Sequence, residues 1–360
     1  MRMRKITMKD VALQTGVSIK TVSNVINGND SQVSAVTKQR ITEAVKQLGY
    51  RVNSSAKSLK TGKTGIIGLA VPNFGQPFFG YFVDMLSSSA HQRGCAIVVA
   101  TYGDFNGGIE EFAASAYKLN ADGWIMFAAD PLSAESPLFQ QNYPMVLTGD
   151  YSAHGLCDMV TMPNVEAARY VTEWLIGRGL TKIGFVGAPR QFLHDAADVK
   201  EIDPYYCEAC AMKAFEGNAA LRLQGYIQAH RRHGLEPDWR HVIGVDSLAG
   251  SSGVKAGFEL AQCVDLPEAL VCVDDALALG VISSLTKMHI DIPNDVQIIG
   301  IDNLPDGEFS IPPLSTIDSH VDQYADMAVD ALIRRIDGDD SAPSIFTSGF
   351  RLLERESTIE

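Results

Sequence analysis

The chain has 360 residues, 46% of them hydrophobic, and a formal net charge of −13, so it exceeds one ordinary domain and can bury proper cores. Its longest apolar runs, at 65–71 and 95–100, are too short to cross a bilayer, which excludes a membrane-spanning protein. The first five residues carry three basic side chains and lead into a capped helix, so no signal peptide is expected. We therefore expect a cytoplasmic protein with its six cysteines reduced.

Two short helices joined by a glycine turn are predicted first. Thr7 and Asp10 supply a cap and an acid for a helix that ends near Gly16. The Ser18 hydroxyl can then accept the amide N–H of Thr21 and cap a second helix. The apolar face of that helix consists of Val22, Val25 and Ile26. Such a pair is typical of a helix-turn-helix, whose second helix enters the DNA major groove, but the spacing alone fits an ordinary helical hairpin equally well.

The charge distribution decides between these two interpretations. Residues 1–63 hold twelve Lys or Arg and three Asp or Glu, a net charge of +9. Because the whole chain carries −13, residues 64–360 carry −22. A small basic head on a large acidic body is the charge division expected when only the head meets phosphates.

The head also resembles a known family. The segments that carry the resemblance are Val17-Ser18, Thr21-Val22-Ser23, Asn27, Val33-Ser34 and Leu48-Gly49-Tyr50. They closely resemble the head of the lac repressor/gal repressor (LacI/GalR) family of bacterial transcription regulators, and the resemblance extends to the last residues. It implies a small all-α helix-turn-helix head and an α/β body of two doubly wound lobes that resembles a periplasmic sugar-binding protein.

By this resemblance, Ile19, Lys20 and Asn24 touch base edges, whereas Thr21, Ser23 and Asn27 are placed for phosphates or capping. Many relatives carry arginine at the position of Asn24; arginine suits guanine, whereas asparagine pairs with adenine. The positions expected to meet DNA are Thr7, Ser18, Ile19, Lys20, Thr21, Ser23, Asn24, Asn27, Asn53, Ala56, Lys57, Leu59 and Lys60. A third helix over 34–48 is expected to close the head core with Val36, Ile41, Val45 and Leu48.

Residues 51–63 follow the head and contain two adjacent serines. The segment has only about two helical turns, so alone in water it should be largely unfolded, and its residues favour a flexible linker. It nevertheless resembles the family's hinge helix, which orders on operator DNA. Leu59 matches the leucine that this helix inserts into the minor groove. Lys57 stands where arginine is commoner, and Val52 replaces a frequent proline.

From residue 65 the pattern changes to alternating strands and helices, which predicts parallel sheets with helices on both faces. We expect a head at 1–50, a hinge at 51–63, a first lobe at 64–162 and 321–341, and a second lobe at 163–318 and 345–360. The chain should cross between the lobes near 162, near 318–321 and near 341–345.

In such sheets ligands bind outside the carboxyl ends of the strands. The residues expected to bind an effector are Phe78, Phe79, Asp150, Asn164, Arg222, Asp274 and Asp302. Among them, Arg222 and Asp302 match family residues that reach the effector. Carboxylates and a guanidinium over an aromatic wall suit a polyhydroxy ligand. Asp274 and Asp275 fit ligand binding and helix capping equally well. Asp274, where relatives often have asparagine, disfavours a phosphorylated or carboxylated effector unless Arg222 is free to neutralise it.

Residues 188–218 are more than a strand-to-helix loop needs, and they contain Cys207 and Cys210. A lone Cys-x-x-Cys lacks the second pair of a zinc site, so we expect a surface loop or a short helix over 208–215, and no metal or cofactor.

The leading hypothesis is a repressor of carbohydrate-utilisation genes, controlled by a small sugar-like effector and acting as a homodimer on a pseudo-palindromic operator. A purine-responsive or other corepressor-dependent regulator is the alternative, and a stand-alone sugar-binding protein is disfavoured by the basic head. No Walker loop, nucleophile elbow or properly spaced metal-ligand set is present, so an enzyme is not expected.

Overall fold

The computed structural model describes residues 6–50, 62–193, 203–263 and 265–359. The chain divides into two compact units, a head at Met1–Thr64 and a body at Gly65–Glu360. Within the described ranges, no helix is both long enough and apolar enough to span a membrane.

The head consists of α1 (Met8–Thr15), α2 (Ile19–Ile26) and α3 (Ala35–Leu48). The predicted caps are confirmed. The Thr7 N–H donates to the Asp10 carboxylate at 2.8 Å, and the Thr21 N–H donates to the Ser18 hydroxyl at 3.0 Å. Gly16 ends α1 in the left-handed conformation, with φ of 64°, which glycine adopts at no steric cost.

The head core is small. Its buried apolar residues are Val11, Ala12, Val22, Ile41, Ala44 and Tyr50. The expectation that Val36 joins this core is wrong, because Val36 is 77% exposed. Val36 precedes Ile41 by five residues, which is roughly 140° around the helix, so the two side chains leave opposite sides of α3. Ala44, one turn after Ile41, lies on the buried face instead.

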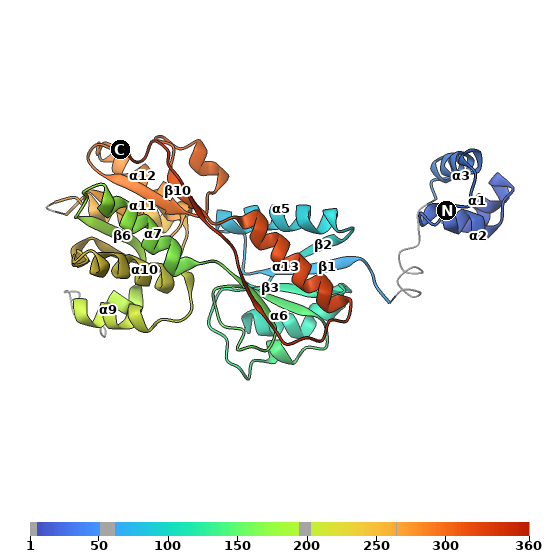
Figure 1. Ribbon diagram of the computed structural model, residues 1–360, viewed down its shortest axis with the longest axis horizontal. Coiled ribbons are helices and arrows are strands. Elements are labelled where there is room, and N and C mark those ends of the chain that lie inside the picture. Colours follow the sequence, from blue (N-terminus) through green and yellow to red (C-terminus); the bar gives the residue numbers. More distant parts are fainter. Residues whose placement is uncertain (1–5, 51–61, 194–202, 264, 360) are drawn as a thin grey trace. The chain divides into compact units, whose positions relative to one another are not determined.

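The body contains two six-stranded sheets (Figure 1). The first has the order β11-β5-β4-β3-β1-β2 and the second β12-β10-β9-β8-β6-β7. The first-sheet strands are β1 (Ile66–Val71), β2 (Ala96–Thr101), β3 (Trp124–Ala128), β4 (Met145–Gly149), β5 (Asp158–Thr161) and β11 (Ile345–Thr347). The second-sheet strands are β6 (Ile183–Pro189), β7 (Val242–Val245), β8 (Ala269–Cys272), β9 (Gln297–Ile301), β10 (Ser315–Asp318) and β12 (Arg351–Leu353). All these pairings are parallel except β10 with β12.

Helices cover both faces of each sheet, which confirms the two doubly wound lobes. On the first sheet, α5 (Pro77–Gln92) and α13 (Val321–Ile336) share one apolar core, and α6 (Gly108–Ala116) builds the other. On the second, α7 (Asn164–Gly177) and α10 (Asn218–Arg232) share one core, while α11 (Gly250–Leu260) and α12 (Asp275–Lys287) share the other. Each core therefore lies between one face of a sheet and the helices that pack on it.

The third crossing between lobes falls later than expected. β11 pairs with β5 of the first sheet, from Ile345 opposite Met159 to Thr347 opposite Thr161. The assignment of all of 345–360 to the second lobe is therefore wrong for its first three residues, and the crossing lies between Thr347 and Arg351. This edge strand could not be predicted from hydrophobic periodicity, because it has only three residues and its Ile345 is 70% exposed.

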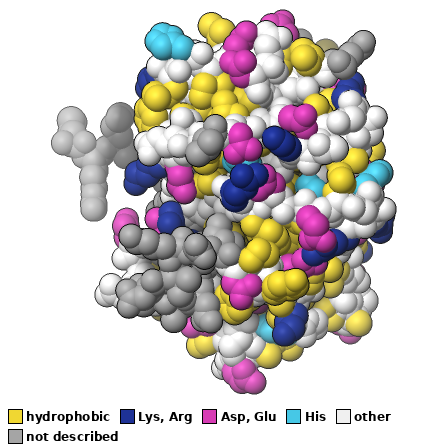
Figure 2. Space-filling view, turned by 90° about the vertical axis from the view of Figure 1, so that its left-hand side faces the viewer, with side chains coloured by type: hydrophobic (Ala, Val, Ile, Leu, Met, Phe, Trp, Pro, Cys, Tyr) yellow, Lys and Arg dark blue, Asp and Glu magenta, His cyan; other side chains and the backbone are white. Residues whose placement is uncertain are grey.

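Residues 188–218 contain α8 (Arg190–Leu193) and α9 (Pro204–Lys213). The helix expected over 208–215 begins earlier, because Asp203 caps it and Pro204 occupies its first turn. It ends at Lys213, two residues before the expected end. Cys207 is buried in the lobe core, and in the described parts of the chain no cluster of His, Cys, Asp and Glu could hold a metal. Figure 2 shows the side of the body that is on the left in Figure 1, where hydrophobic side chains are exposed among charged ones. Tyr205 of α9 and Phe215 are 86% and 76% exposed.

Candidate functional site: a pocket between two lobes

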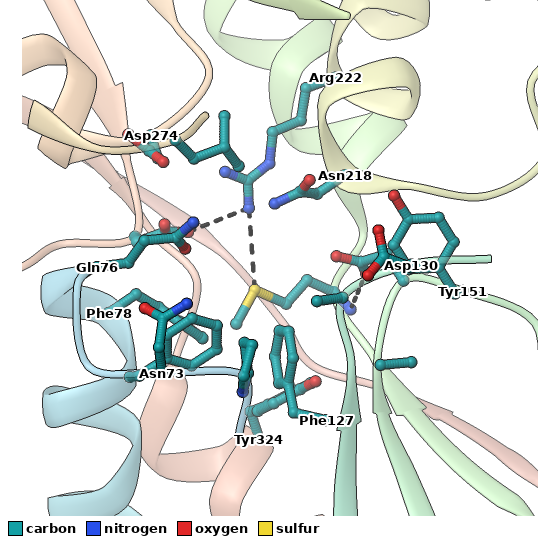
Figure 3. A pocket seen from close by; sticks show the side chains of 18 residues that line it. Asn73, Gln76, Phe78, Phe127, Asp130, Tyr151, Asn218, Arg222, Asp274 and Tyr324 are labelled. Carbon is teal, nitrogen blue, oxygen red and sulfur yellow. Dashed lines mark hydrogen bonds and ion pairs between the residues drawn. The ribbon is translucent and has the colours of Figure 1, made fainter. Parts of the chain in front are cut away.

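A cavity of about 290 Å³ lies between the carboxyl ends of the two sheets (Figure 3). This volume is at the lower end of the range for small-molecule sites. Six of the seven predicted effector residues line it: Phe78, Phe79, Asp150, Arg222, Asp274 and Asp302. Asn164 does not line the cavity, although it bonds two residues that do.

Arg222 is the central polar group of the pocket and is only 2% exposed. Its Nε donates to the Asn164 side-chain oxygen at 2.7 Å, and its Nη2 donates to the Asp302 carboxylate at 3.1 Å. Its Nη1 donates to the carbonyl of Val273. All three guanidinium nitrogens thus have partners within the protein, and Asp302 balances the positive charge.

A chain of hydrogen bonds continues from Arg222 into the first lobe. Asn164, the first residue of α7, donates its amide to the Asp150 carboxylate at 2.7 Å. Asp150 follows β4 and also accepts the Thr161 hydroxyl at 2.7 Å. Because Thr161 and Asn164 flank the first crossing, the network links both lobes through the crossing segment.

Asp274 and Asp275, whose roles the sequence left open, face different surroundings. Asp274 caps α12 by accepting the Leu277 N–H at 2.7 Å, and it also lines the pocket. Asp275 is fully buried and accepts the Leu304 N–H at 2.7 Å and the Thr316 hydroxyl at 2.6 Å. Asp274 is therefore both a cap and a pocket residue, whereas Asp275 braces the loop after β9.

Burial changes the protonation of these carboxyls. It raises the pKa of Asp274 to about 8, and the nearby Asp302 charge adds to the rise while the Leu277 N–H opposes it. Burial likewise raises the pKa of Asp275 to about 7. The pKa of Asp302 is also raised by burial, and Arg222 opposes that rise. At neutral pH Asp274 therefore holds a proton, so it can donate a hydrogen bond to a ligand as well as accept one.

Aromatic side chains form the opposite wall. The rings of Phe79 and Phe127 meet edge to face with centroids 5.0 Å apart, and Phe78 stacks on Phe82 at 5.8 Å. Tyr324 of α13 closes the wall, and its hydroxyl accepts the Gly149 N–H at 2.6 Å. A ligand here would lie between an apolar surface and a set of carboxyl and amide groups.

Several lining residues were not among the predicted set. They are Pro72, Asn73, Gln76, Phe127, Ala128, Ala129, Asp130, Tyr151, Met162, Asn218, Leu248 and Tyr324. The rule that ligands meet the carboxyl ends of strands could have found Asp130 and Tyr151, which come two residues after β3 and β4. No local signal identifies Tyr324, because α13 follows a strand of the other sheet.

The predicted DNA-binding residues lie mainly at the start of α2. Ser18, Ile19 and Lys20 are exposed there. Other predicted side chains have partners within the head. The Thr21 hydroxyl bonds the Ser18 hydroxyl at 2.8 Å, the Asn27 amide donates to the Ser23 carbonyl at 2.7 Å, and the Thr7 hydroxyl donates to Asp10. Asn24 is partly buried. The predicted Asn53, Ala56, Lys57, Leu59 and Lys60 lie outside the described residues.

Comparison with known proteins matches both parts of the chain. Residues 172–358 match the periplasmic binding protein-like domain, and residues 7–53 match bacterial regulatory proteins, lacI family. The chain is 30% identical to the ribose operon repressor of Escherichia coli over 92% of this chain and 93% of that protein. It is 39% identical to a solved LacI-type transcription regulator from Bifidobacterium animalis subsp. lactis, with a TM-score of 0.75 over 82% of this chain and 100% of the other. A solved complex of the transcriptional regulator CelR with cellobiose is 25% identical, with a TM-score of 0.67 over 98% and 100% of the two chains.

Proposed function

The chain belongs to the lacI family of bacterial regulatory proteins, and we propose that it represses carbohydrate-utilisation genes under the control of a small sugar-like effector. As a regulator of this family it binds DNA through its helix-turn-helix head. The observation that carries the proposal is the pocket, where Arg222, Asp274 and Asp302 face a wall of phenylalanines. Charged groups and carboxyls hold vicinal hydroxyls strongly, and an aromatic wall fits the apolar face of a sugar ring.

The pocket favours an uncharged effector. Among the described residues that line it, Arg222 is the only cation, and Asp302 already balances its charge. Asp130 and Asp150 add acidic groups to the same lining. A phosphate or carboxylate would enter this site without a free positive partner, at an unfavourable Coulomb energy. Neutral sugars should therefore bind, and sugar phosphates and sugar acids should not.

We further propose a cytoplasmic homodimer without enzymatic activity, in which effector binding changes how two heads meet a two-fold operator. Phe309 and Ile311, 81% and 85% exposed after the turn Pro305–Glu308, are apolar side chains that a second copy could cover. A purine or other metabolite acting as corepressor is the alternative, since the phenylalanine wall could also pack against a flat base.

A thermal-shift screen of the full chain tests the effector class. A neutral monosaccharide present at about one hundred times its dissociation constant should stabilise the body by about 2.7 kcal/mol. Ribose phosphate and gluconate, as matched anionic probes, should leave the melting temperature unchanged. Stabilisation by the anionic probes alone would contradict the neutral-sugar proposal, and stabilisation by purines alone would favour the alternative.

Asn24→Arg is expected to change which operator the head prefers. Asparagine pairs bidentately with adenine and arginine with guanine, and a good pair contributes about 1–3 kcal/mol of discrimination. Selection of duplexes from a random pool by wild type and variant should therefore differ at one base of each half-site, from adenine to guanine. Asn24→Gln, which keeps the amide, should retain adenine. Identical selected sequences for wild type and Asn24→Arg would refute base contact by this position.

A further inference from the structure

We propose that residues 214–217 form a latch between the lobes, which clamps Tyr151 as one end wall of the pocket and so limits the effector to a single ring. The latch lies between α9 and α10, inside the long segment 188–218. Its role in ligand size rests on the proposed sugar-binding function, whereas the contact between the lobes does not.

Two hydrogen bonds join the latch to the first lobe. The Gly217 N–H donates to the Asp150 carbonyl at 2.7 Å. The Ser152 N–H donates to the Glu216 carboxylate at 3.0 Å. Asp150 and Ser152 belong to the turn after β4 of the first sheet, whereas Gly217 directly precedes α10 of the second lobe. Separating the lobes at this end therefore breaks both bonds.

Tyr151 lies in this turn and lines the pocket beside Asp130 and Asn218 (Figure 3). Its ring packs on Gly217, where an added Cβ would come within 3.3 Å of the Tyr151 hydroxyl. Gly217 also has φ of 83°, a conformation that other residues adopt only with strain. Burial and the neighbouring acids, including Glu216, raise the pKa of Tyr151, so the ring stays neutral. The latch thus holds a neutral, flat side chain across one end of the cavity.

The latch is fixed to the helix that carries Arg222. The Gln224 amide nitrogen lies 3.1 Å from the carbonyls of both Ala211 and Met212 and 3.3 Å from that of Ala214. The Gln224 side chain of α10 therefore binds the carbonyl groups at the end of α9 and fixes the position at which the chain enters residues 214–217. Because Arg222 lies half a turn earlier on α10, the latch and the main effector-binding group belong to one rigid support. A ligand longer than the cavity would have to displace Tyr151 and break the latch.

Amide hydrogen exchange of the full chain without ligand tests the contact itself. Glu216→Ala should increase exchange in peptides that contain Ser152 by about fivefold, the effect of one ordinary net hydrogen bond. The matched control is Glu208→Ala, which removes an acid from the same segment. The ion-pair partner of Glu208 is Arg231, which lies in the second lobe, so this variant leaves the contact between the lobes intact. Equal exchange of these peptides in wild type and Glu216→Ala would overturn the latch, whatever the effector is.

Binding of D-ribose, D-glucose, cellobiose and maltotriose, measured by calorimetry, tests the size limit. Wild type should bind a monosaccharide and reject the longer sugars, and Glu216→Ala should accept longer sugars and bind the monosaccharide about fivefold more weakly. Unchanged size selectivity in Glu216→Ala, or tight cellobiose binding by wild type, would overturn the size limit. If wild type binds none of these sugars, the proposed sugar effector is contradicted. The exchange experiment would still show whether the latch joins the two lobes.

Discussion

Arg222→Met is expected to abolish the effector's influence on DNA binding and to lower the free energy of unfolding of the body by about 3–5 kcal/mol. The substitution leaves the buried Asp302 carboxylate without its ion pair and the Asn164 side-chain oxygen and Val273 carbonyl without their donor. An unpaired buried charge costs far more than the pair itself contributes. Urea unfolding of the full chain and DNA binding with and without effector measure the two losses.

The double variant Arg222→Met with Asp302→Asn separates stability from binding. Removing both charges eliminates the uncompensated carboxylate, so the double variant should recover part of the lost stability. It should still fail to respond to the effector, because both polar groups of the proposed site are changed. If Arg222→Met unfolds like wild type, the ion pair does not stabilise the pocket. If the double variant responds normally to the effector, the two residues do not bind it.

The two buried carboxyls Asp274 and Asp275 should make the free energy of unfolding fall as the pH rises from 4 towards 8. In the unfolded chain Asp274 and Asp275 lose their protons near the ordinary aspartate value of about 4, whereas in the folded body they hold them until about pH 8 and about pH 7. The folded state binds more protons over this interval, so raising the pH favours unfolding. This stability is fully present below pH 4, and the interval between pH 7 and pH 8 reports mainly Asp274.

Asp274→Asn should flatten that last part of the curve. Asparagine does not titrate and can still cap α12, so the variant should lose less stability between pH 7 and pH 8 than wild type. One group contributes at most about 1.4 kcal/mol per pH unit, a difference that urea unfolding at the two pH values resolves. Parallel pH curves for wild type and Asp274→Asn would show that Asp274 does not hold its proton in the folded protein.

Local features of the fold could be predicted because they depend on neighbouring residues. The Ser18 and Thr21 cap follows from residues three apart, and the two lobes follow from strand and helix periodicity. Val36 could not be placed, because an apolar residue near the start of a helix fits either face until the other helices are positioned. β11 could not be predicted, since its pairing with β5 joins residues far apart in the sequence and its side chains are mostly exposed.

For the candidate site, too, the sequence predicts some residues but not the contacts between them. Asp302 could be proposed from its place after a strand, and both Arg222 and Asp302 from the family resemblance, but their pairing is visible only in three dimensions. Sequence could not separate Asp274 from Asp275, because the separation depends on which carboxyl faces the Leu277 amide and which faces Thr316. The contact of Glu216 with Ser152 joins residues 64 positions apart and has no local signal.

Fluorescence anisotropy of the full chain on an operator duplex selected from a random pool, with and without the neutral sugar that raises its melting temperature, tests whether the pocket controls DNA binding. The sugar should weaken DNA binding by about 5- to 150-fold, the usual size of an allosteric coupling, and Arg222→Met should remove this change. DNA binding that is unaffected by a sugar shown to stabilise the body would contradict control of the head by the pocket.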